Sequence, residues 1–152
     1  MTFDVAAGLL TVDPERDNEA PYTIPATSGK GACMNQPKCQ RDQGQGPIPQ
    51  GQYYILASEV NEPNAIRAWW WNERPRSMGG ADWGSFRVPI HAEKGTKMPG
   101  RDPRTFKFHG GRYPGSAGCV DIGGGIYGND VTRRVLRDLR ADPDGRIPLI
   151  VK

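Results

Sequence analysis

The sequence has little of several residue types, and each scarcity excludes a class of protein. Its 152 residues include only 2 histidines and 3 cysteines, and no second cysteine pair matches the Cys-x5-Cys spacing at 33 and 39, so we expect no zinc site. No apolar run approaches the roughly 18 residues that a membrane-spanning helix needs. The net charge of +3 is too small to indicate a nucleic-acid partner and would only favour contact with an anionic polymer. We expect no metal and no cofactor.

Glycine and proline are the residues that the chain has in abundance. The 20 glycines and 14 prolines, with moderate apolar content, indicate many turns and short strands. A chain of 152 residues is long enough to bury one core without help. The composition therefore predicts a mainly β fold with one domain over residues 1–152.

Apolar residues that alternate along the chain predict a series of short strands. They cover residues 2–5, 9–12, 22–26, 52–57, 86–91 and 147–151. Pro25 and Pro89 limit two of these strands to a sheet edge or a bulge, because proline has no N–H to donate to a neighbouring strand. Residues 52–57 are apolar on both faces, which favours a central position.

One helix is predicted in the C-terminal half of the chain. Asn129 can cap a helix over residues 130–140, in which Val131, Val135, Leu136 and Leu139 form one apolar stripe. Residues 65–71 fit a helical turn or a strand, and the prolines and glycines of residues 74–80 end whichever forms.

The four tryptophans have two interpretations. Trp69, Trp70, Trp71 and Trp83 can bury aromatic area in the core, which is the commoner role, or form a lid or wall on which a ligand stacks. The sequence does not choose between them.

A possible disulfide comes from cysteine spacing. Cys33 and Cys39 lie in a long Gly- and Pro-rich segment, residues 28–51, that needs a brace or a function. A bridge closing so short a loop contributes roughly 2 kcal/mol and indicates an oxidising destination such as the periplasm. The alternative is two free thiols in a cytosolic protein.

The candidate chemistry lies between residues 106 and 121. Phe106 and Phe108 alternate with Lys107 and His109, so a strand here buries the two rings and presents the imidazole on the other face. After a Gly-rich turn, Cys119 and Asp121 share one face of an extended segment, residues 118–122.

We expect these two segments to be antiparallel neighbours that pair His109 with Cys119. An imidazolium and the Lys107 ammonium both favour the nucleophilic thiolate. Gly118 lets backbone N–H groups, its own and that of Cys119, approach an oxyanion. The predicted oxyanion and substrate-binding residues are Gly110, Ser116, Gly118 and Asp121. His91 is an alternative base, although nothing near it in sequence resembles a nucleophile.

These residues resemble the active-site signature of the YkuD-like L,D-transpeptidases, in which a His-Gly is followed by Ser-x-Gly-Cys. The Gly-Ser-Ala-Gly-Cys-Val-Asp run at 115–121 and the Gly-Pro-Ile-Pro segment at 46–49 are more similar to the type VI secretion L,D-transpeptidase effectors. The resemblance covers most of the chain, from the hairpin at Gly8 to the strand after His109. It implies a single-domain β-sandwich on which the C-terminal-half helix packs.

The chain departs from the housekeeping enzymes at two positions. Those enzymes usually carry His before the Gly-Cys and Arg two residues after the cysteine, where this chain has Ala117 and Asp121. The departures make trimming of peptidoglycan stem peptides more plausible than cross-linking. A backbone carbonyl commonly orients the imidazole in the resembled fold, and Asp121 is the alternative for His109.

The resemblance implies a cysteine enzyme with Cys119 as nucleophile and His109 as its base. It would act on peptidoglycan stem peptides as an L,D-carboxypeptidase that releases terminal D-Ala or exchanges it for D-amino acids; the acceptor is left open. Two other functions stay open: a Cys-dependent amidase or endopeptidase of the same polymer, and a catalytically silent wall-binding module.

The resemblance also implies a location and a partner. The first ten residues contain Asp4 and no basic residue, so they do not form a secretory signal, and we expect another route to the periplasm of a target bacterium. An antibacterial effector implies a cognate immunity protein. We expect a monomer.

Overall fold

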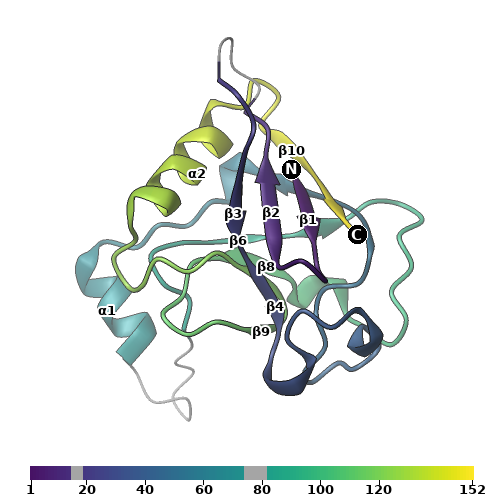
Figure 1. Cartoon of the computed structure of the whole chain (residues 1–152). Helices are drawn as coiled ribbons and strands as arrows, with labels where there is room; N and C mark the ends of the chain where they lie inside the picture. The colour runs from purple at the N-terminus through teal and green to yellow at the C-terminus, as the bar shows by residue number, and fades with distance from the viewer. Residues whose placement is uncertain (15–18, 74–81) are drawn as a thin grey trace.

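The computed structural model of the chain describes residues 1–14, 19–73 and 82–152 (Figure 1). Within them the strands form a six-stranded sheet of order β3-β2-β1-β10-β5-β7 and a four-stranded sheet of order β4-β9-β8-β6. The strands of the first sheet are β1 (Thr2–Asp4), β2 (Leu9–Val12), β3 (Tyr22–Pro25), β5 (Gly51–Leu56), β7 (His91–Ala92) and β10 (Arg146–Val151). Those of the second are β4 (Thr27–Gly29), β6 (Arg87–Pro89), β8 (Lys107–His109) and β9 (Ser116–Asp121).

The first sheet joins the two ends of the described chain. β1 and β2 form the predicted hairpin, with Gly8 at φ 65°, a conformation that favours glycine in the tight turn. β1 then pairs in parallel with β10, and β10 pairs along its whole length with β5. β5 has neighbours on both sides, as its two apolar faces predicted, and β3 with Pro25 lies at the edge.

The second sheet carries the predicted chemistry, but its central pairing differs from our expectation. β8 and β9 are parallel, with Phe108 opposite Val120 and His109 opposite Asp121. The antiparallel prediction is wrong because residues 110–119 do not make a hairpin. The amide of Gly115 donates to Thr27 Oγ1, and β9 pairs with β4 before it reaches β8, so the chain returns to the starting end of the sheet.

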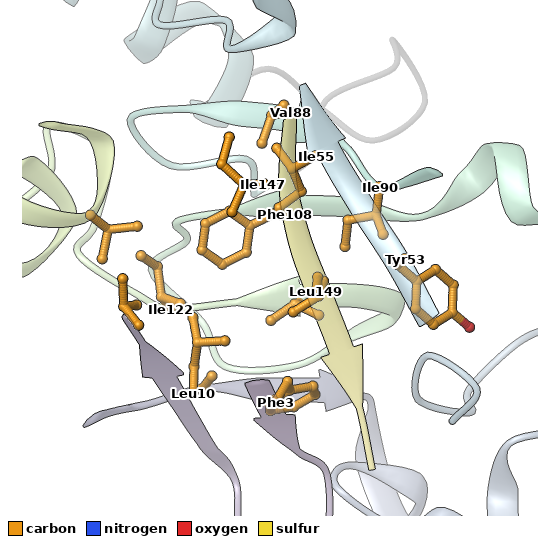
Figure 2. Packing of buried hydrophobic residues seen from close by; sticks show 14 of the residues in the cluster. Phe3, Leu10, Tyr53, Ile55, Val88, Ile90, Phe108, Ile122, Ile147 and Leu149 are labelled. Atoms are coloured by element: carbon orange, nitrogen blue, oxygen red, sulfur yellow. The ribbon is translucent and has the colours of Figure 1, made fainter. Parts of the chain in front are cut away.

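The core lies between the two sheets. Phe108 of β8 and Ile122, which directly follows β9, belong to the same buried cluster as Phe3, Ile55 and Leu149 of the first sheet (Figure 2). Each of these side chains is at most 8% exposed. Burial of apolar area at roughly 25 cal/mol per Å² therefore holds the sheets face to face. The mainly β sandwich architecture predicted from the sequence is confirmed.

The predicted C-terminal-half helix is α2 (Asp130–Ala141), which packs beside β3 (Figure 1). Asn129 caps it through a capping box in which the Asn129 side chain accepts from the amide of Thr132. Val135, Leu136 and Leu139 are buried, while Val131 is exposed at the end of the stripe.

Residues 65–71, for which the sequence allowed a helical turn or a strand, belong to a second, shorter helix, α1 (Ala65–Glu73). The prolines and glycines that we expected to end this element, at residues 74–80, lie outside the described residues. Trp69 and Trp70 are about half exposed on α1, at 51% and 49%, so the core interpretation is wrong for them. Trp71 lies under the Arg87 guanidinium, 4.1 Å from the ring centroid.

The strand predicted over residues 86–91 is divided between the two sheets. β6 ends at Pro89, and β7 begins at His91 in the other sheet. Pro89 places β6 at the sheet edge, as predicted. None of the helices in the described part of the chain is long and apolar enough to cross a membrane.

Candidate active site

The structure brings Cys119 and His109 to one cavity. β8 delivers His109 and the neighbouring β9 delivers Cys119, and both side chains line a cavity of about 540 Å³. Its other walls are Lys30, Asp82, Trp83, Thr105, Tyr113, Gly115, Ser116 and Ala117. Ser116 therefore lines the same cavity as Cys119 and His109.

His109 is buried, with 2% of its surface exposed. Burial lowers the pKa of the imidazole, because it penalises the charged form, while the charges of Asp121 and Asp82 act in the opposite direction. Neither ring nitrogen has a hydrogen-bond partner among the described residues. The ring of Trp83 packs edge-on against the imidazole, with centroids 5.5 Å apart. The ring is therefore positioned by packing, and both nitrogens remain available.

Cys119 is equally enclosed and is 3% exposed. Burial raises the pKa of the thiol, while the Ser116 hydroxyl and the backbone and ammonium of Lys107 lower it. The sulfur lies 3.9 Å from the carbonyl oxygen of Thr105. Burial thus favours a neutral thiol beside a neutral imidazole, in contrast to the thiolate and imidazolium expected from the sequence.

Gly118 does not have the oxyanion role predicted for it. Its N–H donates to the carbonyl oxygen of Gly46 at 3.0 Å and is not free to bind a substrate oxygen. Gly118 has φ 76°, and a Cβ there would lie 2.6 Å from Arg101 Nη2 and 2.7 Å from the Phe106 ring. The missing side chain makes room for Arg101 and Phe106.

Gly110 and Asp121 are not among the residues that line the Cys119 cavity, and Asp121 lines a different one. Gly110 packs against the carbonyl of Gly123, which a Cβ would approach to 2.5 Å. Asp121 Oδ1 accepts from the amides of Gly111 at 3.0 Å and Gly123 at 2.8 Å. Direct substrate contact by these two residues is therefore not supported.

Asp121 nonetheless acts on His109 through its charge. Burial raises the pKa of Asp121, and the neighbouring His109 lowers it. The carboxylate makes no hydrogen bond to the imidazole in the described structure, whose ring nitrogens are unpartnered. Its influence on His109 is electrostatic.

Asp82 and Trp83 also line the cavity. The sequence did not predict that these two neighbouring residues lie together beside His109. Asp82 Oδ2 accepts from the amides of Arg112 and Tyr113, each at 2.7 Å. Its Oδ1 is buried without a hydrogen bond, 3.7 Å from Arg112 Nε. Trp83 is a wall of the cavity, the second of the two interpretations given to it. The Asp-Trp pair has no periodicity or spacing that connects it with His109 in the sequence.

A disulfide-braced loop contacts the strand that carries Cys119. Cys33 and Cys39 are joined by the predicted disulfide, with their Cα atoms 5.6 Å apart. Arg101 is 8% exposed and donates to the carbonyl oxygens of Gln40, Gly46 and Pro47. The loop is therefore fixed to β9 through Gly46 and to the interior through Arg101.

His91, the alternative base, lies elsewhere. Its Nε2 is 2.5 Å from Glu59 Oε2, and its ring stacks on Tyr54 at 5.0 Å. It lines a different cavity from Cys119. In residues 1–14, 19–73 and 82–152, no three His, Cys, Asp or Glu side chains gather in a way that could hold a metal ion.

Comparison with known proteins gives a family and no individual relative. No curated protein matches the chain. The family model described as the Tlde1 domain matches residues 22–138, which is more than half of the chain and includes Lys30, Asp82, His109 and Cys119. The chain therefore belongs to the Tlde1 domain family, the family of type VI secretion L,D-transpeptidase effectors.

Proposed function

We propose that residues 1–152 form one catalytic domain, a cysteine-dependent L,D-carboxypeptidase that releases terminal D-Ala from tetrapeptide stems of peptidoglycan or exchanges it for another D-amino acid. One observation carries this proposal: Cys119 and His109, from adjacent strands, line the same cavity of about 540 Å³. Membership of an L,D-transpeptidase-like effector family supports peptidoglycan as the polymer.

The first step is a proton transfer from Cys119 to His109. Burial of both groups favours the neutral pair before substrate binds. When the sulfur attacks the carbonyl of the L-centre of diaminopimelate, the proton passes to the imidazole. The charges of Asp121 and Asp82 favour the imidazolium that forms. The peptide C–N bond then breaks, and His109 returns the proton to the departing amine of D-Ala.

The second step resolves the thioester on Cys119. Attack by water gives a shortened stem and free enzyme, whereas attack by a D-amino acid gives exchange. The same imidazole takes the proton of the incoming nucleophile and returns it to the sulfur. The acceptor depends on which molecule reaches the cavity beside Trp83 and Tyr113.

The oxyanion needs donors other than Gly118, whose N–H is occupied by Gly46. The amide of Cys119 keeps the role proposed from the sequence. The Ser116 hydroxyl, which lowers the pKa of the thiol through a hydrogen bond, is the second polar group at the sulfur. Removing one such donor in other enzymes costs about 3 kcal/mol, so both positions should be sensitive.

The site of action that we propose is the periplasm of a target bacterium. Family membership supports delivery by type VI secretion into a target cell. The Cys33–Cys39 bridge fits an oxidising compartment, because such bridges are rare in reducing ones. We expect the effector to act as a monomer and the producing cell to hold a cognate immunity protein against it. The relation to the wider YkuD-like fold stays a prediction.

The test is the product list from purified muropeptides incubated with the wild type and with Cys119→Ala. We expect the wild type to remove one alanine from tetrapeptide stems and the variant to remove none. Separation of stem from glycan would indicate an amidase instead. Binding without any product would indicate a wall-binding module. Mass spectrometry of the products distinguishes the three.

A further inference from the structure

A second cavity adjoins the segment that leads into β8. It has a volume of about 400 Å³, and its walls include Tyr54, His91, Arg104 and Lys107. Thr105, in the same segment, lines the Cys119 cavity. The two cavities therefore share one short stretch of chain. No carboxylate is among the described residues that line the second cavity, whereas the basic side chains of Arg104 and Lys107 are.

Lys107 connects this second cavity to the nucleophile. Phe108 pairs with Val120 across the parallel strands, so Lys107 and Cys119, one residue earlier on each strand, lie beside each other. Residues opposite each other on paired strands point to the same face of the sheet, and so does every second residue along one strand. Lys107, which is opposite Cys119 and two residues before His109, is therefore on the same face as both. The Lys107 charge lowers the pKa of the thiol, as expected of a cation at this position.

Among the described residues, no acid forms an ion pair with the Lys107 ammonium. The neighbouring acids have partners of their own: Asp102 binds Arg104 at 2.9 Å, Glu59 binds His91 at 2.5 Å and Glu93 binds Arg146 at 2.5 Å. In the part of the chain that the structure describes, no carboxylate lies within ion-pair distance of Lys107. A half-buried cation beside a cavity without acids is suited to bind an anion from outside.

We propose that Lys107 binds the C-terminal carboxylate of the stem peptide and that the second cavity receives the terminal residue. This inference rests on the proposed function. The terminal carboxylate is one residue from the scissile carbonyl, and consecutive Cα atoms are about 3.8 Å apart, so the carboxylate of a stem held at Cys119 lies close to the neighbouring strand position, which Lys107 occupies. Lys107 then restricts cleavage to stems whose chain ends directly after the scissile bond.

The test uses two alkylating reagents that differ in charge. Iodoacetate carries a carboxylate, and iodoacetamide is its neutral counterpart. Their labelling rates at Cys119 are measured at a pH where both react, and each is compared with the rate for a free thiol. A change in the thiol pKa alters both rates equally, so their ratio isolates binding of the carboxylate. We expect Lys107→Gln to lower the iodoacetate rate roughly threefold to fivefold more than the iodoacetamide rate.

Two further variants serve as controls. Lys107→Arg keeps the positive charge and should retain most of the iodoacetate preference, which also shows that the position tolerates substitution. Lys30→Gln removes the lysine that lines the Cys119 cavity and should leave the ratio near the wild-type value. An unchanged ratio in Lys107→Gln, or loss of the preference in Lys30→Gln alone, overturns the inference while leaving the cysteine mechanism intact. If neither reagent labels Cys119, the inference and the proposed function both fail.

A second measurement uses substrates. Tetrapeptide stems with a free C-terminal carboxylate and with a C-terminal amide are compared for release of the terminal residue. The wild type should favour the free acid through a lower KM, and Lys107→Gln should lose most of that difference. Equal use of the two stems by the wild type contradicts the carboxylate assignment without affecting the nucleophile.

Discussion

The backbone N–H of Gly118 donates to the carbonyl oxygen of Gly46 at 3.0 Å. Arg101 Nη2 donates to the same oxygen at 3.3 Å. One carbonyl thus joins the strand that carries Cys119, the disulfide-braced loop and a buried guanidinium. The position of Cys119 therefore depends on residues far from it in sequence.

Arg101→Met should destabilise the fold by about 3 kcal/mol. The substitution keeps apolar bulk beside Phe106 but leaves the carbonyl oxygens of Gln40, Gly46 and Pro47 short of donors. Urea unfolding followed by circular dichroism measures the loss. Arg104→Met is the matched control, because its guanidinium is exposed and its effect should stay within about 0.5 kcal/mol. Equal effects of the two variants would show that the Arg101 contacts do not hold the loop.

Gly118→Ala should cost more stability than Gly123→Ala and should disturb Cys119. Both glycines have positive φ, so both substitutions carry a backbone cost of about 1–2 kcal/mol. At Gly118 the new Cβ would lie 2.6 Å from Arg101 Nη2, whereas at Gly123 no atom of the described residues lies within 4 Å. Denaturation midpoints and the rate of Cys119 alkylation check this, and similar results for the two variants would speak against the close packing.

The double substitution Cys33→Ser and Cys39→Ser should lower the free energy of unfolding by roughly 2 kcal/mol. The bridge closes a short loop, so its entropic contribution is modest. A reductant should lower the unfolding midpoint of the wild type toward that of the double variant and leave the variant unchanged. If complete reduction left the unfolding midpoint of the wild type unchanged, the disulfide would not contribute to stability.

Alkylation of Cys119 should rise with pH through a pKa above the ordinary thiol value of about 8.5. Burial raises the pKa of this thiol, and only the thiolate reacts, so labelling is slow at neutral pH and faster in alkali. Ser116→Ala removes a hydrogen bond that lowers the pKa and should shift the curve to higher pH still. A midpoint below the ordinary value would indicate a preformed thiolate.

Asp82→Asn should reduce kcat by roughly tenfold while leaving the fold intact. An asparagine oxygen can still accept from the amides of Arg112 and Tyr113, so the change mainly removes charge. Because that charge raises the pKa of His109, its loss should lower that pKa further and move the acidic limb of the pH–rate profile to lower pH. Asp144→Asn, on the surface, is the control. An unshifted profile would assign Asp82 a purely structural role.

The sequence predicted that His109 and Cys119 come together, and both line one cavity, because the signal for each residue is local. The alternation of Phe106 and Phe108 with His109 predicts which face carries the imidazole, and the Ser-x-Gly-Cys spacing places Cys119 on a neighbouring strand. The capping residue Asn129 and the α2 stripe are equally local. Propensity and periodicity determine such features with little help from tertiary contacts.

What the sequence missed depends on contacts between distant segments. The parallel pairing of β8 and β9 follows from the contact of Gly115 with Thr27, which no spacing reveals. The Gly118 amide is occupied because the loop returns at Gly46. Asp82 and Trp83 reach His109 only through the fold. Burial also opposes the expected thiolate and imidazolium: it raises the pKa of Cys119 and lowers that of His109, since it penalises both ions.

The most direct measurement of the central claim is intact-protein mass spectrometry of a reaction with tetrapeptide muropeptide, quenched in acid. We expect a transient adduct of the shortened stem on Cys119 that hydroxylamine cleaves, as it does a thioester. Cys119→Ala should show no adduct and release no D-Ala. Release of D-Ala by Cys119→Ala at the wild-type rate, with no adduct on the wild type, would contradict it.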